Sequence, residues 1–313
     1  MIDLVTFGET MVSFRTSGAL VSGAACTAHV AGAESNVAIA LSRLGHRARW
    51  VGGLTDDALG DLVAATLTGE GVDVVRADPV GRPAGLMLLQ RRTADVARVA
   101  YARKDSAGSC LTEAPVLEAL EHGARRLHVT GITPALSDTA RQTTLTVVTE
   151  AARRGVAVSL DVNHRAALWS REDARAVLTE IVPHVDLLVA SADELDLVGE
   201  DGASEEDLIA DLADRGCAEV LLKRGGEGAT LHRDGRRLDA AARPVTVVDV
   251  VGAGDACTAG YLSGRLDGVS DEACLERAMT LGAFAVSTVG DWEGLPRRHE
   301  LGLLSGAASD VTR

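Results

Sequence analysis

Cysteine is scarce in this chain, and its placement argues against a disulfide framework. The 313 residues include five cysteines, at positions 26, 110, 217, 257 and 274, and no C-x-x-C pair occurs among them. An odd number of widely spaced cysteines is not typical of a disulfide-stabilised secreted domain. The eight histidines form no H-x-x-x-H or Cys/His cluster, so the sequence does not predict a zinc site. We therefore expect reduced thiols in a cytoplasmic protein.

The sequence also lacks long apolar runs and an excess of positive charge. No apolar run approaches about 18 residues, and residues 1–10 have no basic-then-apolar pattern, so we expect neither a membrane span nor a signal peptide. Lys and Arg number 31 against 45 Asp and Glu, which gives a net charge of −14. Such an acidic surface disfavours nucleic acid and anionic membranes as partners. It does not exclude a phosphate-bearing substrate, because local dipoles and cations decide phosphate binding.

Strand-like apolar runs alternate with helical patterns through much of the chain. With 46% apolar residues, the chain can bury a large core. Strands are predicted at residues 126–130, 156–161, 186–190, 220–223 and 244–251, and helices at 37–44, 137–153, 205–215 and 256–266. This alternation predicts an α/β fold with a mostly parallel sheet and helices on both faces. Ligands of such folds bind at the carboxyl ends of the strands.

Two segments, at about residues 11–30 and 84–103, interrupt this alternation. Within the second segment, residues 85–91 and 96–103 have the composition of two paired strands. We therefore expect a small β-rich flap inserted into a single domain that spans residues 1–313.

The most informative stretch is Asp249-Val250-Val251-Gly252-Ala253-Gly254-Asp255, between the strand predicted at 244–251 and the helix predicted at 256–266. Unpaired N–H groups at a helix start bind anions, and the two glycines allow close approach of an oxyanion. Asp255 on the first turn could take a proton from a hydroxyl group that attacks a phosphorus atom held by these N–H groups. The alternative is an ordinary strand-to-helix turn in which Asp255 supports the helix start.

A second Gly-rich motif lies near the other end of the chain. The stretch from Ala31 to Asn36 precedes apolar residues at helical spacing, and Gly45 is a suitable helix stop. Asn36 would then lie on the first turns of this helix, where its amide can donate to and accept from sugar hydroxyls. The alternative is a capped amphipathic helix on which Asn36 is incidental.

With these two motifs in place, the sequence resembles the ribokinase-like (PfkB) carbohydrate kinases. Three further pieces match between them: Asp161-Val162-Asn163-His164-Arg165, Ser191-Ala192-Asp193-Glu194 and Lys223-Arg224-Gly225-Gly226-Glu227-Gly228. The resemblance spans roughly residues 5–294. It implies a three-layer Rossmann-like sheet with a β-rich lid over the sugar, ATP and Mg²⁺ as ligands, and a homodimer formed through the lid.

Tyr101 and Arg103 would lie on one face of a strand in the flap, about 7 Å apart by the two-residue repeat. A phenol beside a guanidinium can hold a carboxylate and hydroxyls, although an exposed strand face with an aromatic and a charge is common. The stretch Tyr101 to Ala107 resembles the Tyr-x-Arg-x-x-Ser-Ala stretch of the 2-keto-3-deoxygluconate kinase branch. This resemblance implies that Tyr101 and Arg103, with Gly32, Ala33 and Asn36, hold a sugar acid.

Asp161, Asn163 and Arg165 follow a predicted strand at alternate positions, so they share a face if the chain stays extended. Asp161 could act through water on a hard cation, and Asn163 could touch phosphate oxygens. By resemblance, Arg165 contacts the sugar acid or the phosphoryl group in transfer. A strand-end Asx-turn is the alternative.

The remaining pieces would contact the nucleotide. By resemblance, Glu194 organises Mg²⁺ through water, and Ser191 replaces the family's Asn, which removes one amide contact. Ser191 and Glu194 also fit a capping box that opens an acidic helix. Lys223, Gly225 and Gly228 would lie along the nucleotide phosphates or ribose, although the same stretch fits a plain β-turn.

The resemblance also implies a monovalent-cation site, with K⁺ as the candidate ion. It would use Asp249, Val251, Ser287 and Gly290, mainly through backbone carbonyls that leave no side-chain signature. Residues 283–290 are also where the family packs adenine.

The sequence therefore predicts an ATP-dependent kinase that phosphorylates the terminal hydroxyl of a sugar acid, most like 2-keto-3-deoxygluconate. Asp255 is the expected general base, and Gly252, Ala253 and Gly254 supply the anion hole. The alternatives are a fructokinase or ribokinase for a neutral sugar, and a non-catalytic sugar-binding regulator. A Rossmann-type dehydrogenase is disfavoured because no strand-linked G-x-G-x-x-G with a later acidic residue is present.

Overall fold

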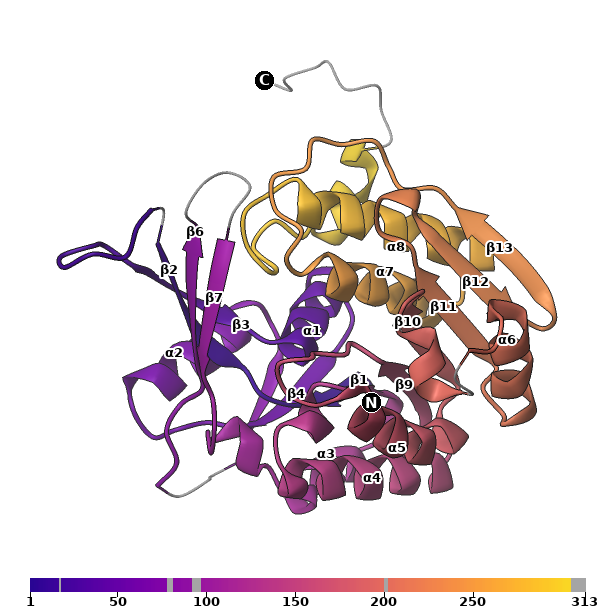
Figure 1. Cartoon of the computed structure of the whole chain (residues 1–313), viewed down its shortest axis with the longest axis horizontal. Coiled ribbons are helices and arrows are strands. Elements are labelled where there is room, and N and C mark those ends of the chain that lie inside the picture. Colours follow the sequence, from indigo (N-terminus) through magenta and orange to yellow (C-terminus); the bar gives the residue numbers. More distant parts are fainter. Residues whose placement is uncertain (17, 78–80, 92–96, 200–201, 305–313) are drawn as a thin grey trace.

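A nine-stranded sheet forms the centre of the protein (Figure 1). The computed structural model describes residues 1–16, 18–77, 81–91, 97–199 and 202–304. Seven strands pair in parallel, in the spatial order β11 (Glu219–Lys223), β10 (Leu187–Ser191), β9 (Ala157–Asp161), β8 (Ala124–Thr130), β1 (Ile2–Phe7), β4 (Ala48–Gly53) and β5 (Asp73–Ala77). Strands β12 (Ala229–Arg233) and β13 (Arg236–Ala240) add two antiparallel strands beyond β11. The carboxyl ends of the seven parallel strands therefore share one edge.

Helices cover both faces of this sheet. One apolar core packs the sheet against α3 (Glu113–Glu121), α4 (Asp138–Arg153), α5 (Arg171–Ile181) and α6 (Glu205–Asp214). The other core packs it against α1 (Ala33–Arg43), α2 (Ala58–Gly69), α7 (Ala253–Asp267) and α8 (Asp271–Val286). Side-chain caps start α2, α4, α5, α6 and α8, at Asp57, Ser137, Ser170, Ser204 and Ser270. The predicted three-layer α/β fold is confirmed.

A second, four-stranded sheet lies beside the main sheet, to the left in Figure 1. Its order is β3 (Thr27–Ala31), β2 (Met11–Thr16), β6 (Leu86–Arg91) and β7 (Ala97–Ala102). β2 pairs antiparallel with β3 and parallel with β6, which in turn pairs antiparallel with β7. The predicted β-rich flap is thus present as a small sheet, with Val96 of its predicted second strand outside the described residues.

The prediction of a strand at residues 244–251 is wrong. This stretch is irregular, and Val247 and Val250 are 61% and 70% exposed. The N–H groups of Val248 and Asp249 donate to the Val286 carbonyl at the end of α8, at 2.7 and 3.2 Å, rather than to a strand. β-Branched composition reflects a preference for a paired, half-buried strand, and this chain has already left the sheet at its edge strand β13.

Candidate active site

A cavity of about 600 Å³ opens between the small sheet and the carboxyl edge of the main sheet. The small sheet contributes one wall, and the starts of α1 and α7 contribute another. Its lining residues include Glu9, Met11, Gly32, Ala33, Asn36, Met87, Leu89, Tyr101, Arg103, Arg165, Val251, Gly252, Asp255 and Asp291. Residues predicted from both ends of the chain to bind the sugar therefore lie around one space.

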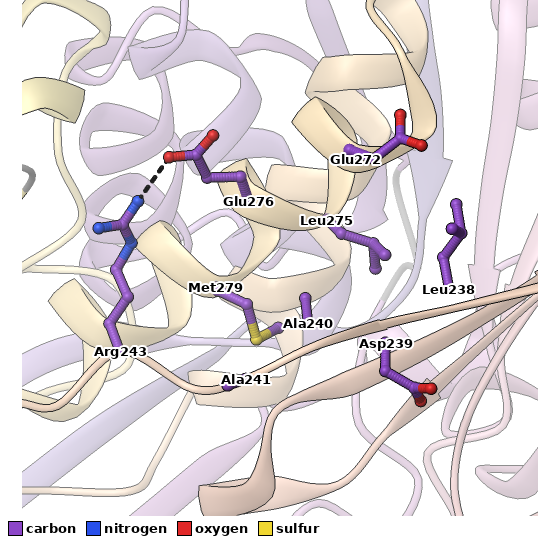
Figure 2. A pocket seen from close by; sticks show the side chains of 9 residues that line it. All are labelled: Leu238, Asp239, Ala240, Ala241, Arg243, Glu272, Leu275, Glu276 and Met279. Carbon is purple, nitrogen blue, oxygen red and sulfur yellow. Dashed lines mark hydrogen bonds and ion pairs between the residues drawn. The ribbon is translucent and has the colours of Figure 1, made fainter.

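A smaller cavity of about 220 Å³ lies between β13 and α8 (Figure 2). Arg243 and Glu276 form a 2.9 Å ion pair at this cavity, and Leu238, Leu275 and Met279 supply apolar lining. None of the residues predicted to bind sugar, nucleotide or metal lines it. The larger cavity is therefore the candidate active site.

The anion-binding turn begins helix α7. Gly252 is the residue before the helix and has φ = +74°, in the left-handed region that favours glycine. A Cβ at this position would also lie 2.0 Å from the Asp291 carbonyl oxygen. The N–H groups of the first turn lack intrahelical acceptors and carry the positive end of the helix dipole. The predicted helix start is confirmed, although an irregular segment rather than a strand leads into it.

Asp255 lies on this first turn and faces helix α1. The Asn36 amide Nδ2 donates to Asp255 Oδ2 at 2.8 Å, and Asn36 Oδ1 is buried without a hydrogen-bond partner among the described residues. Burial raises the pKa of Asp255 to about 7, and the nearby Asp161 acts in the same direction, while Asn36, Lys223 and Arg165 oppose the rise. A carboxyl group with this pKa can exchange a proton near neutral pH. The buried, unpaired amide oxygen can accept a hydrogen bond from a ligand hydroxyl.

Lys223 and Asp161 form an ion pair close to the anion turn. Lys223 Nζ lies 2.8 and 2.7 Å from the two carboxylate oxygens of Asp161, and the Thr258 hydroxyl donates to Asp161 Oδ2 at 3.0 Å. A Cβ on Gly254 would lie 3.5 Å from Lys223 Nζ, so this cation is next to the turn. Burial disfavours the charge on Lys223, but Asp161 and Glu194 outweigh it and raise its pKa. Lys223 therefore stays charged beside the anion-binding N–H groups.

Tyr101 and Arg103 lie side by side, as predicted. The Arg103 guanidinium stacks 5.7 Å from the Tyr101 ring centroid. It also binds the buried carboxylate of Glu9, with Nη2 2.6 Å and Nε 2.7 Å from Oε2, and the Ser106 hydroxyl donates to the other Glu9 oxygen. Glu9 was not predicted from the sequence, although it follows the end of β1 and so lies at the edge where ligands bind.

Asp291 is a second residue that the sequence analysis missed. It follows Gly290 in the segment after α8, lines the cavity, and pairs with Arg15 of β2 at 2.7 Å. Burial raises the pKa of Asp291 to about 6, against the opposing effect of Arg15. Neither Glu9 nor Asp291 belongs to one of the sequence motifs described above.

The expectation that Asp161, Asn163 and Arg165 share an extended face is wrong. β9 ends at Asp161, and Asn163 has φ = +42°, so the chain turns sharply there. Asn163 is buried, whereas Arg165 is exposed and lines the cavity. Asn tolerates this left-handed backbone better than most residues.

Ser191 and Glu194 form part of the predicted capping box without the predicted acidic helix. The Ser191 N–H donates to Glu194 Oε2 at 2.8 Å, and the His164 N–H donates to Oε1 at 2.7 Å. Only the short 3₁₀ helix η4 (Leu195–Val198) follows. Glu194 therefore holds the end of β10 against the turn after β9.

The Gly-rich stretch after Lys223 forms the turn between β11 and β12. Gly225 and Gly228 have φ = +56° and +115°, and a Cβ on Gly228 would lie 1.9 Å from the Ala240 carbonyl oxygen. The turn is open at Gly225 and Gly226, where a Cβ would meet no atom within 4 Å. Its contact with a nucleotide stays a prediction.

The residues proposed for a monovalent cation come from two segments that lie side by side. The hydrogen bonds from Val248 and Asp249 to Val286 bring Asp249 and Val251 close to Ser287. Asp249 is buried, and its carboxylate accepts from the Val251 N–H at 3.3 Å. Within the described part of the chain, no three or more His, Cys, Asp or Glu side chains group as metal ligands. The metal roles of Asp161, Glu194, Asp249 and Val251 stay predictions, as does the role of Ser287.

Comparison with known proteins identifies the family to which this chain belongs. A family profile described as "pfkB family carbohydrate kinase" matches residues 1–298. A 2-dehydro-3-deoxygluconokinase from Bacillus subtilis (strain 168) is 35% identical, covering 99% of this chain and 97% of its own. A 2-dehydro-3-deoxygalactonokinase from Haloferax volcanii is 34% identical, covering 92% of each chain. The crystal structure of a PfkB protein from Polaromonas sp. JS666 superposes with a TM-score of 0.86 at 31% identity, over 96% of this chain and 99% of that one.

The chain therefore belongs to the pfkB family of carbohydrate kinases, and the resemblance inferred from its motifs is confirmed. It is a phosphotransferase with an alcohol group as acceptor. No helix among the described residues is long and apolar enough to cross a membrane.

Proposed function

We propose that this kinase transfers the γ-phosphate of ATP to the terminal hydroxyl of a sugar acid, 2-keto-3-deoxygluconate. The observation that carries the proposal is the placement of Asp255. This carboxyl group has a pKa of about 7, lies on the first turn of α7 beside the Gly252 turn, and faces the cavity that Arg103 and Arg165 line. A base, an anion hole and cationic sugar contacts thus surround one space.

The chain's own groups account for each bond change in the transfer. Asp255 takes the proton of the sugar hydroxyl, whose oxygen then forms a bond to the γ-phosphorus while the bond to the ADP oxygen breaks. The N–H groups of Gly252, Ala253 and Gly254 and the Lys223 ammonium stabilise the negative charge on the phosphoryl oxygens. Asn36 holds Asp255 through Nδ2 and offers its unpaired Oδ1 to a sugar hydroxyl. The small sheet shields this chemistry from water, which would otherwise compete with the sugar.

The acidic residues near the turn could bind Mg²⁺ only through bridging water molecules. Asp161 is already bound by Lys223 and Thr258, and Glu194 by two backbone N–H groups. Mg²⁺ usually keeps several waters and binds substrate phosphates with few carboxylates, so this donor set is compatible with it. The ion would neutralise the polyphosphate. Asp249 and the adjoining carbonyl groups would hold K⁺.

The nucleotide would extend from the anion turn along the open turn at Gly225 and Gly228, near Ser191 and Asn163. Its adenine would lie against residues 283–290. Val247 and Val248, which are 61% and 44% exposed in the segment bonded to the end of α8, offer apolar surface there. Exposed valines beside a helix end are suited to stacking against a flat base.

The choice of a sugar acid is supported by two cations that line the cavity, Arg103 and Arg165. Tyr101 and Arg103 lie together on the small sheet, and Arg165 lines the cavity from the turn after β9. A guanidinium binds a carboxylate through paired hydrogen bonds, which a neutral sugar does not offer. The relatives at 34–35% identity are named for 2-dehydro-3-deoxy sugar acids of the gluconate and galactonate series.

A second candidate, a kinase for a neutral sugar such as fructose or ribose, is favoured by one observation. Arg103 is already paired with the buried Glu9 carboxylate at 2.6 Å. Part of its charge is therefore neutralised before any ligand binds. In that case Arg103 would donate to hydroxyl groups rather than hold a carboxylate.

The test compares ATP-dependent ADP release with 2-keto-3-deoxygluconate, 2-keto-3-deoxygalactonate, fructose and ribose. We expect turnover on a sugar acid, loss of that turnover in Asp255→Asn, and little activity on neutral sugars. Preference for fructose or ribose would keep the kinase and reject the sugar acid. Binding of a sugar by calorimetry without turnover would instead identify a non-catalytic regulator.

The small sheet also supports the expected homodimer. Its edge strands β3 and β7 each pair with only one strand among the described residues, and the β7 side chains Val99 and Tyr101 are 44% and 50% exposed. A second copy packed on this sheet would cover them and close the cavity. Sedimentation equilibrium at several concentrations tests this, and a monomer throughout would reject it.

A further inference from the structure

The segment after α8, residues 288–295, is held from two sides. On one side, the Trp292 indole N–H donates to the Val30 carbonyl of β3 at 2.8 Å. On the other, Arg43 of α1 stacks 5.2 Å from the Trp292 ring and donates to the carbonyl oxygens of Trp292, Glu293 and Leu295 at 3.0, 3.1 and 2.7 Å. This segment therefore joins the small sheet to the helix that carries Asn36.

A buried arginine of the small sheet is the strongest of these connections. Arg15 of β2 binds Asp291 through Nη2 at 2.7 Å and Glu293 through Nη1 at 3.2 Å, and its side chain is only 9% exposed. His29 of β3 also contacts Glu293, with Nδ1 2.8 Å from Oε1. A buried guanidinium is costly unless it is well paired, and removing Arg15 would leave the buried Asp291 carboxylate unpaired beside the partly exposed Glu293 carboxylate.

Asp291 connects this arginine to the anion turn. Its side chain lines the cavity. Its main chain packs directly on Gly252: a Cβ on Gly252 would lie 2.0 Å from the Asp291 carbonyl oxygen and 2.9 Å from its Cα. Because the two backbones lie this close together, a displacement of Asp291 would also displace the anion turn.

We propose that Arg15 is a positioning residue for phosphoryl transfer, which holds Asp291 from the small sheet and thereby fixes the anion turn at Gly252. The small sheet thus does more than cover the sugar, because its placement sets the geometry of the phosphate site. Arg15 also neutralises the charge of Asp291, which lines the cavity where ATP and the sugar acid, both anionic, would meet. This proposal rests on the kinase function proposed above.

The test compares Arg15→Met and Arg15→Lys with a matched control, Arg233→Met. Arg233 makes a similar ion pair with Asp271 at 2.7 Å, between β12 and α8, and does not line the cavity. With the sugar that the native enzyme uses, Arg15→Met should lower kcat about tenfold to a hundredfold, as small misplacements of reacting groups do. KM for ATP should change less than about threefold, Arg15→Lys should recover part of kcat because it keeps the charge, and the control should stay within about twofold.

A double-mutant cycle with Asp291→Asn tests whether Arg15 acts through Asp291. If it does, the double variant loses no more kcat than the worse single variant, because the two residues act as a unit. Losses in kcat that multiply would overturn the proposal. So would an Arg15→Met enzyme with native kcat, or one whose loss equals that of the control.

Hydrogen exchange provides a readout that does not need activity. Amides in a peptide covering residues 250–258 should exchange faster in Arg15→Met than in the native protein, with no such change in Arg233→Met. Unchanged exchange in this peptide would reject the coupling between Arg15 and the anion turn. If the native protein phosphorylated none of the sugars, the proposed function would fail, and this exchange measurement alone would decide the coupling.

Discussion

Replacing Asp255 by Asn should remove catalysis and, at neutral and alkaline pH, stabilise the fold. Burial raises the pKa of Asp255 from its ordinary value of 3.8 to about 7. The folded protein therefore binds this proton more tightly than the unfolded chain does. The contribution of Asp255 to the free energy of unfolding is fully present below about pH 4 and is lost as the pH rises to about 7. Above about pH 7 it does not change further. Asn has no such titration and still accepts a hydrogen bond from Asn36.

The size of the effect follows from the two pKa values. At about 1.4 kcal/mol for each tenfold change in proton affinity, a rise from 3.8 to about 7 corresponds to a ceiling of about 4 kcal/mol. Asp255 is partly exposed to the cavity, and solvent screening reduces the cost of the charge, so we expect about 2 kcal/mol at pH 8. In a protein of this length that raises Tm by about 3 °C.

Thermal unfolding of both proteins at pH 4.5 and pH 8 measures this directly. The gain in Tm should be clearly larger at pH 8 than at pH 4.5. The control is Asp214→Asn, which changes an exposed carboxylate at the end of α6 and should give no pH-dependent gain. A gain for Asp255→Asn that does not grow with pH, or a loss at pH 8, would refute the reasoning. In the native enzyme, kcat/KM should rise with pH and level off above about pH 7.

Three further substitutions test other parts of the site. Gly252→Ala should lower kcat about a hundredfold or more, because the left-handed backbone and the close carbonyl contact force the anion turn to move; steady-state kinetics with kcat within threefold of native would contradict this. Lys223→Met should lower Tm by about 5–8 °C, because it leaves the buried Asp161 carboxylate unpaired, and adding Asp161→Asn should restore most of the loss. Arg103→Leu should lower kcat/KM for the sugar acid about tenfold to a hundredfold, whereas Arg98→Leu, at an exposed position of the preceding strand β7, should leave it unchanged; equal effects on fructose would point to a neutral sugar.

The chemistry of the site could be predicted where it depends on short motifs. The Gly-Ala-Gly-Asp stretch specifies a helix start, a left-handed turn and a carboxylate on the first turn, all within a few residues. Asn36 could be placed near a helix start for the same reason. That Asn36 contacts Asp255, 219 positions along the chain, follows from α1 and α7 packing on the same face of the sheet, which the alternation of strands and helices only implies.

The parts that could not be predicted depend on long-range partners. Val247 and Val250 have strand-like chemistry, but a strand needs a neighbour, and no strand among the described residues pairs with this segment. Glu9 and Asp291 are single acidic residues whose importance comes from their ion pairs with Arg103 and Arg15, which are distant in the sequence. Nothing in the local sequence of Arg15 indicates that its side chain would be buried rather than exposed.

The most direct test of the central claim is to identify the product of the reaction. The native protein would be incubated with ATP, Mg²⁺ and 2-keto-3-deoxygluconate, and phosphorus NMR would follow the γ-phosphate. We expect a new phosphomonoester on the terminal hydroxyl, formed in equal amount with ADP by the native protein and absent with Asp255→Asn. Release of inorganic phosphate without a sugar phosphate, or an undiminished product with Asp255→Asn, would contradict it.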